Sequence, residues 1–269
     1  MAYNSAYDLH DLMVNTKQAT IYTAHENSLF LTGKIVPMIQ LPAGSIVAQV
    51  PVFATGHAAT KLYDETTNAA TEDIPGTALT TSSVTISANI YAARTTLRDL
   101  GGIDTSETGR VLGNSIQTAF DTDVIAAMSG FTSSAVSVVS VDKLFDAAAQ
   151  IRETGETGQL TCILSPTEAA TLMKDVGSAA YAGGDFQTEG LRNGFLGMIA
   201  GMRVFQSSYV SGANKGYVFG EDALRIAMFK NVDLEVARRA EAVGNDIVAS
   251  LHAGVGAIDA TRGVKLLIA

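Results

Sequence analysis

A run of large apolar residues that repeats every four positions is the feature that most restricts the fold of this chain. Its members are Leu112, Ile116, Phe120, Val124 and Met128. Val111, Ala119 and Ala127 would widen the same stripe. This spacing places the apolar side chains on one side of an α-helix, so the run predicts a long amphipathic helix that packs against a core.

The flanking residues set the limits of that helix at 104–129. Asp104 and Glu107 give it an acidic first turn, and Gly130 ends it. At 1.5 Å per residue the helix would be roughly 37 Å long. Asp121 and Asp123 are two positions apart and point to different sides, which favours two solvated charges over a metal-binding pair.

A long, weakly apolar segment separates two predicted strands in the first hundred residues. The strands are Gln49–Phe53 and Thr85–Tyr91, and the second alternates with period two. Pro51 cannot donate a hydrogen bond to a neighbouring strand, so its strand should lie at an edge or in a projecting hairpin. Loops as long as 55–81 usually serve a function or contact another subunit; a mobile surface loop is the alternative.

The rest of the chain mixes helices and strands, which predicts an α+β fold. Residues 141–154 form a second amphipathic helix, and the strand Leu160–Leu164 leads into a helix that starts at Ser165-Pro166. Residues 177–197 should form a glycine-rich loop with a short helical piece at 191–196. The segments 201–206, 217–220 and 224–229 are expected in one sheet, and 246–252 and 264–268 supply the last strands.

Composition excludes several classes of function. The chain has 27 acidic against 18 basic residues, a net charge of −9, and no basic cluster that would neutralise nucleic acid phosphates. Its apolar runs are far shorter than the ~20 residues of a membrane span, and its first residues do not resemble a signal peptide. Cys162 is the single cysteine and is expected to be buried in its strand.

No pattern of residues predicts catalysis, a metal site or a bound cofactor. The histidines are His10, His25, His57 and His252, and no two lie within twelve positions of each other. His25-Glu26 lacks the second histidine of a zinc protease motif, and phosphate-binding, dinucleotide-binding and hydrolase motifs are absent. We therefore predict a protein that is not an enzyme, with no catalytic, cofactor-binding or metal-binding residues. The arginines Arg94, Arg98, Arg238 and Arg239 are expected to form ion pairs on the subunit surface.

Three passages resemble the major capsid proteins of tailed bacteriophages, which share the Hong Kong 97 fold. They are residues 160–173 (LTCILSPTEAATLM), residues 197–208 (GMIAGMRVFQSS) and the closing segments 246–259 and 264–268. The order of elements also resembles this family, and the likeness covers nearly the whole chain.

The resemblance implies the following division of the chain. Residues 1–34 would be an N-terminal arm, extended or partly helical, and 45–93 an extended β-hairpin loop. Residues 94–155 and 231–269 would form a peripheral domain containing the spine helix 104–129, and 156–230 an axial domain. Lys61 is the only lysine in the extended loop, but no cross-linking partner for it can be assigned.

The resemblance also implies a function. Pentamers and hexamers of the chain would build an icosahedral shell around double-stranded DNA, in a virion assembled in the host cytoplasm. Portal, scaffold and cement proteins are the expected partners, with the scaffold separate or absent because the chain begins at the arm. DNA would be contacted non-specifically, and no membrane is involved. The alternative is the shell of an encapsulin-type bacterial nanocompartment. In either shell we expect the arm and the hairpin to find their partners only on neighbouring copies.

Overall fold

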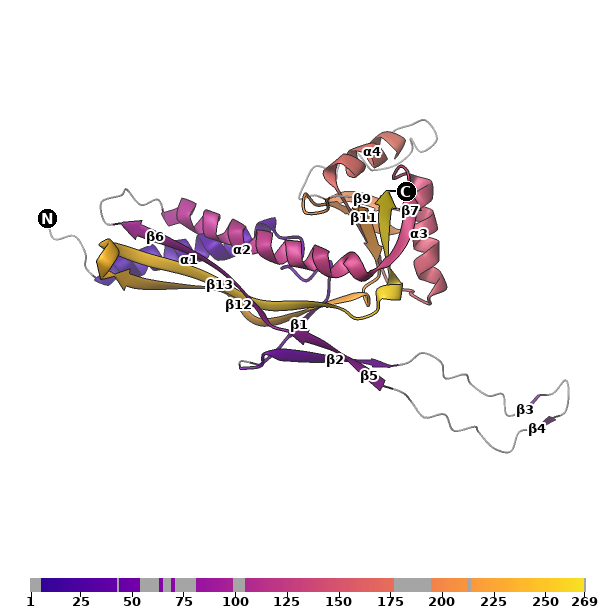
Figure 1. Ribbon diagram of the computed structural model, residues 1–269, viewed down its shortest axis with the longest axis horizontal. Coiled ribbons are helices and arrows are strands. Elements are labelled where there is room, and N and C mark those ends of the chain that lie inside the picture. The colour runs from indigo at the N-terminus through magenta and orange to yellow at the C-terminus, as the bar shows by residue number, and fades with distance from the viewer. Residues whose placement is uncertain are drawn as a thin grey trace.

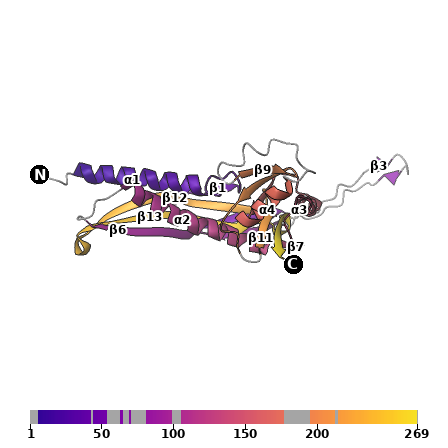
Figure 2. The ribbon, with the colours of Figure 1, turned by 90° about the horizontal axis from the view of Figure 1, so that it is seen from above.

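The long helix of the apolar stripe is the spine of an elongated platform. The computed structural model describes residues 6–42, 44–53, 63–64, 69–70, 81–98, 105–176, 195–211 and 214–268. Helix α2 (Thr105–Ala127) continues into a short 3-10 helix at Met128–Gly130. It lies along the sheet of the platform, and α1 (Ala6–Asn27) runs beside it (Figures 1 and 2).

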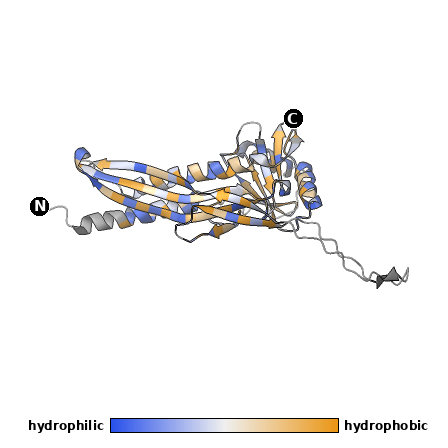
Figure 3. Ribbon diagram, turned by 60° about the horizontal axis from the view of Figure 1, so that its bottom comes forward, coloured by the Kyte–Doolittle hydropathy of each residue, from blue (hydrophilic) through white to orange (hydrophobic). Residues whose placement is uncertain are grey.

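Four strands form the platform sheet, in the order β1-β12-β13-β6. Strand β12 (Leu224–Arg239) and strand β13 (Gly244–Ala257) form a long antiparallel hairpin, closed by the 3-10 turn Ala240–Ala242. Strand β6 (Asn89–Arg98) pairs antiparallel with β13, and the short β1 (Met38–Gln40) pairs parallel with β12. Apolar and polar residues alternate along these strands, as expected where one side of a sheet faces a core (Figure 3).

A second sheet forms a smaller lobe at one end of the platform (Figure 1). Its order is β7 (Thr132–Val136), β14 (Gly263–Ile268), β11 (Asn214–Phe219), β8 (Leu160–Leu164), β10 (Met202–Gln206) and β9 (Phe195–Ile199). Helices α3 (Val141–Glu153) and α4 (Pro166–Val176) belong to this lobe, and the 3-10 turn Ala260–Arg262 leads into β14. All five residues of β8 are buried, as in a central strand.

A two-stranded ribbon leaves the platform at the end nearer the lobe (Figure 1). It consists of β2 (Val47–Phe53) and β5 (Thr81–Ser87), which pair antiparallel. Beyond it, the two-residue strands β3 (Tyr63–Asp64) and β4 (Ala69–Ala70) pair with each other. The expected projecting hairpin is therefore present, with Pro51 in a strand that has one partner among the described strands.

The buried apolar residues of the described chain form two large clusters and one small one. The largest contains the inner side of α2, residues of the arm and the platform sheet, and it extends to Ile163, Tyr217 and Phe219 of the lobe strands. The second fills the lobe around β8, α3 and α4, and the small third cluster lies at the base of the ribbon. The stripe of α2 is buried as predicted from Leu112 to Met128. Val111 and Ala119 are exposed instead, because the buried side of the helix is narrower than the widened stripe.

Three details of the strand prediction need correction. Residues 224–229 pair in the platform sheet, whereas 201–206 and 217–219 pair in the lobe sheet, so these segments are not one sheet. Residues 195 and 196 begin strand β9 and are not helical; 191–194 lie outside the described residues. The second ribbon strand ends at Ser87, and a separate strand starts at Asn89 and joins the platform.

The strand pairing also divides the chain differently from the expected domain limits. Strands β7 and β14 were placed with the peripheral part, yet they hydrogen-bond within the lobe sheet beside β11 and β8. The first half of β12, expected in the axial part, belongs to the platform sheet. Chain crossings between the two sheets account for this difference, since sequence position alone does not show which strand pairs with which.

Candidate functional site

The base of the ribbon is fixed to the platform by a close backbone approach. Ala48 and Ile86 face each other across the ribbon and are both buried with Ala227 of β12. A Cβ atom at Gly254 or Gly256 of β13 would lie within 3 Å of the Ile86 side chain. These two glycines therefore let the ribbon cross the sheet at this point, which sets its direction.

The apolar side of the ribbon continues past this anchor. Val50 and Val84 pair across the two strands, and with Val52 they are only half buried. At the base, Ile46 is 73% exposed and Ile90, at the start of β6, is 67% exposed. A two-stranded ribbon is marginal on its own in water, so this partly uncovered apolar side favours contact with another chain.

The arm packs against its own subunit. This corrects the expectation from the sequence that the arm finds its partners only on neighbouring copies. Helix α1 packs along α2 of the same subunit, where Cβ atoms added to Gly109 and Gly113 would lie 2.7 Å from the carbonyl oxygens of Thr16 and Thr20. The absence of side chains at these two glycines allows the helix backbones to meet. The side of α1 in this contact is built from small residues, namely Thr16, Thr20, Thr23 and Ala24, all buried.

Polar contacts also tie the arm to strand β12. The Lys17 ammonium lies 2.7 Å from one carboxylate oxygen of Asp233, and the Lys230 ammonium lies 3.1 Å from the other. These two cations hold the pKa of Asp233 well below its ordinary value. Nε2 of His25 lies 3.3 Å from the side-chain oxygen of Asn231. Two residues of α1 thus have specific polar partners on β12.

Asp121 is buried at the joint between arm, spine and lobe, and the prediction of a solvated charge was wrong. It is 1% exposed and accepts hydrogen bonds from the Ser28 hydroxyl (2.6 Å), the Gln117 amide (2.8 Å) and the Leu29 backbone N–H (3.4 Å). Burial raises the pKa of Asp121, and these three hydrogen bonds offset part of the rise. The Gln117 amide also donates to the Tyr209 hydroxyl of the lobe, at 3.1 Å.

Asp123 behaves as predicted for an exposed residue of the same helix. Its carboxylate accepts a hydrogen bond of 2.8 Å from the Tyr91 hydroxyl. Burial and this acceptor raise the pKa of Tyr91 to about 12. The two aspartates therefore point to different sides of α2, and only one of them faces the core.

The buried carboxyl of Asp121 predicts a defined pH dependence. Because its pKa is raised in the folded state, folding binds a proton there, and the free energy of unfolding should rise as pH falls from above the native pKa toward the ordinary value of 3.8. Urea unfolding of the wild type and Asp121→Asn between pH 7 and pH 4 measures this. The wild type should gain stability relative to the variant on acidification. Ser115→Ala changes an exposed residue that does not titrate, so its free energy of unfolding should differ from that of the wild type by the same amount at every pH. A pH-independent difference for Asp121→Asn would contradict the prediction.

A cavity of about 930 Å³ opens beside this joint. Its walls come from the end of α1 and the loop after it, from the middle of α2, and from β10 with the turn that follows. Asp121, Gln117 and Tyr209 line it, together with two cations, Lys34 and Arg203. The cavity has a mixed polar and apolar lining, since Leu29, Ile35 and Phe205 also contribute to it, and it lies where the arm, spine and lobe meet.

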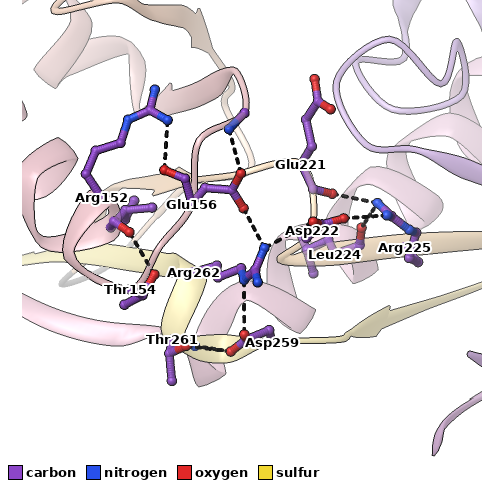
Figure 4. A network of polar contacts seen from close by, with 12 residues as sticks. Arg152, Thr154, Glu156, Glu221, Asp222, Leu224, Arg225, Asp259, Thr261 and Arg262 are labelled. Atoms are coloured by element: carbon purple, nitrogen blue, oxygen red, sulfur yellow. Dashed lines mark hydrogen bonds and ion pairs between the residues drawn. The ribbon is translucent and has the colours of Figure 1, made fainter. Parts of the chain in front are cut away.

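A partly buried arginine connects the lobe to the platform (Figure 4). Arg262 contacts Glu156 at 3.1 Å, Asp222 at 3.0 Å and Asp259 at 3.2 Å. These carboxylates come from the loop before β8, the turn before β12 and the turn before β14. The Glu156 side chain is only 5% exposed, and its other oxygen accepts the Gly158 backbone N–H at 2.8 Å. Arg262 thus neutralises a buried carboxylate where three connections meet.

The residues examined for chemistry in the sequence do not come together. Cys162 is buried in β8, as predicted, and burial raises the pKa of its thiol. His25 lies on α1 and His252 on β13; His57 and Lys61 lie outside the described residues, and so does the side chain of His10. Within the described ranges, no three His, Cys, Asp or Glu side chains are grouped as a metal ion would require. None of the helices described has the length and apolar content of a membrane span.

The expected ion pairs are confirmed for Arg94 and Arg239, and the side chain of Arg98 lies outside the described residues. Arg94 forms an ion pair with Asp246, and Arg239 lies 3.9 Å from the same carboxylate. The sequence did not predict that Asp121 is buried, that Lys34 and Arg203 line a cavity, or that Arg262 joins three carboxylates. For Arg262 one signal was available, since Asp259 and Arg262 are three positions apart; the remaining contacts join residues distant in the sequence.

Comparison with known proteins identifies the family. A phage capsid protein family model matches residues 104–266, more than half of the chain. No curated protein sequence matches. Among solved structures, the capsid of cyanophage P-SCSP1u has a TM-score of 0.69 at 16% identity, covering 90% of this chain and 89% of that chain. A Microbacterium phage Oxtober96 structure has a TM-score of 0.68 at 12% identity, covering 90% and 91%.

The fold defines a capsid shell subunit of the Hong Kong 97 type, and the chain belongs to the phage capsid protein family. The resemblance to capsid proteins of tailed bacteriophages is therefore confirmed. The protein is a structural component of a capsid and is not an enzyme. As a capsid shell protein it self-assembles, and its location is the virion.

Proposed function

We propose that this protein is a major capsid protein whose pentamers and hexamers close into an icosahedral shell around double-stranded DNA. The phage capsid family and the capsid structures of the same fold support this proposal. The observation that carries it is the ribbon β2–β5, which leaves the platform and keeps a partly uncovered apolar side. A neighbouring copy would cover this side.

In this proposal the elements have distinct roles in the shell. The four-stranded platform with α2 acts as the peripheral domain, the six-stranded lobe as the axial domain, and residues 45–88 as the extended loop. The helical arm at 6–27 stiffens its own platform, and the ribbon is the element that reaches another subunit. Portal, scaffold and cement proteins would bind the assembled shell.

The acidic composition suits a container for DNA. A net charge of −9 disfavours tight binding of phosphates, so packaged DNA would contact the wall non-specifically. Close packing of DNA would then not depend on its sequence.

An encapsulin-type nanocompartment is the second candidate. A structure named as a virus-like particle from Pyrococcus furiosus has a TM-score of 0.66 at 12% identity, and the match covers 94% of this chain and 98% of that chain. Its length thus agrees closely with that of this subunit. Particles purified from the native source distinguish the two: a phage capsid contains double-stranded DNA, and a nanocompartment contains a cargo protein.

Deleting Thr60–Ala78 tests the role of the hairpin. The deletion lies beyond the anchored base of the ribbon, so the subunit should stay soluble and folded. Shell formation should be lost or strongly reduced, measured by light scattering and negative-stain microscopy. A control that scrambles the order of residues 60–78 keeps length and composition. Loss of shells in both variants identifies specific contacts; normal shells from the deletion variant would contradict the role of the hairpin.

A further inference from the structure

Three basic side chains in the described part of the chain lack a polar partner. They are Lys34, Lys174 and Arg203, none of which forms a hydrogen bond or ion pair among the described residues. In this acidic protein the other described Lys and Arg side chains have partners. Two of the three, Lys34 and Arg203, line the same cavity at the joint of arm, spine and lobe. Two exposed and unpaired cations in one concave site indicate a place for negative charge.

The cavity provides hydrogen-bonding groups around these cations. Lys34 comes from the loop between α1 and β1, and Arg203 from β10. Ser207, Ser208 and Thr118 add hydroxyl groups, and Thr118 already lies 3.2 Å from the Tyr209 hydroxyl. A volume of about 930 Å³ is large enough to receive several side chains of another chain. An arginine in such a site can hold a carboxylate with two parallel hydrogen bonds.

We propose that this cavity is an assembly contact in which a second copy of the chain places acidic side chains against Lys34 and Arg203. The proposal rests on self-assembly of the shell. Each copy carries 27 acidic residues and a net charge of −9, so neighbouring copies repel unless some acidic surface meets positive charge. The two cations supply that complement at the one described joint where arm, spine and lobe meet.

The surroundings favour carboxylates of a protein over DNA phosphates. Asp121 and Glu26 also line the cavity. A nucleic acid strand brings a continuous row of phosphates, which would approach both acidic residues as well as the cations. The acidic side chains of a protein are separate single charges, so each can contact Lys34 or Arg203 while staying away from Asp121 and Glu26.

Charge reversal tests the contact in purified subunits. Lys34→Glu with Arg203→Glu should leave the melting temperature of the subunit near that of the wild type, because neither side chain has a partner within the subunit. The concentration for half-maximal shell assembly should rise about tenfold or more, since like charges would then face each other. Lys174→Glu, the third unpaired cation and outside the cavity, is the matched control and should assemble as the wild type.

Each outcome has a defined meaning. If the wild type and the double variant both form normal shells, the proposed contact is refuted and the proposed function remains intact. Absence of wild-type shells would overturn both. Normal empty shells that lose DNA retention in the double variant would assign the cavity to phosphates and refute the contact between copies.

Cross-linking supplies a direct second test. Shells assembled from equal amounts of ¹⁴N- and ¹⁵N-labelled subunits are treated with a carbodiimide, which joins a lysine amine to a carboxylate in contact with it. Peptides containing Lys34 should be joined to acidic peptides of the opposite label. Lys34→Arg keeps the charge, so it should assemble normally and lose these products. Same-label products alone would show that the contact is within one subunit and overturn the proposal.

Discussion

Replacing Phe120 by alanine should lower the free energy of unfolding by about 3–5 kcal/mol, the usual effect of removing a large aromatic side chain from a core. Phe120 is 0% exposed at the centre of the spine helix. Its ring meets the Tyr91 ring of β6 edge to face, with centroids 5.6 Å apart. The substitution therefore removes both buried area and an aromatic contact between helix and sheet. Chemical denaturation of the unassembled subunit measures the change.

Val111→Ala is the matched control on the same helix. Val111 is 56% exposed, so its truncation should change the free energy of unfolding by less than about 0.5 kcal/mol. Equal effects at the two positions would mean that α2 is rotated relative to the arrangement described above.

Replacing Arg262 by methionine should be comparably damaging, at about 3–5 kcal/mol, because it leaves a buried carboxylate without its cation. Glu156 is the residue affected, since Asp222 and Asp259 are more exposed and can be solvated. The variant should show a lower urea midpoint with an unchanged slope, because a contact is lost while the folded surface stays similar.

A double-mutant cycle separates this effect from simple loss of packing. Glu156→Gln keeps an oxygen for the Gly158 N–H but removes the negative charge. Combined with Arg262→Met, it should recover much of the lost stability. Asp222→Asn alone should cost less than about 1 kcal/mol, as exposed ion pairs do. Additive losses for Arg262→Met and Glu156→Gln would show that Glu156 does not depend on Arg262.

Residues whose own chemistry dictates burial were predictable from the sequence. The repeat of large apolar residues from Leu112 to Met128 predicted the spine helix within a few residues, because such side chains favour burial whatever surrounds them. The Ser165-Pro166 start of α4 and the buried strand before it are likewise local signals. Pro51 indicated a strand with a free edge because proline has no backbone N–H to donate to a neighbouring strand.

The arm was predicted poorly because its buried side is not apolar. Thr16, Thr20 and Thr23 face the spine helix, and their spacing carries no hydrophobic signal. The Thr20 hydroxyl bonds to the Thr16 carbonyl oxygen at 2.8 Å within the helix, so its burial needs no distant partner. What determines the packing is the pair of glycines some ninety positions further along the chain.

The sequence by itself thus determined the spine helix, the strand–turn–helix of the lobe, the projecting hairpin and the capsid family. Only the tertiary structure decided where the arm lies, that Asp121 is buried, that Arg262 neutralises Glu156, and that Lys34 and Arg203 share a cavity. The physical reason is that moving an apolar side chain out of water lowers the free energy whichever apolar neighbours it then meets. The burial of a charged or small polar residue depends on partners that folding brings from distant positions.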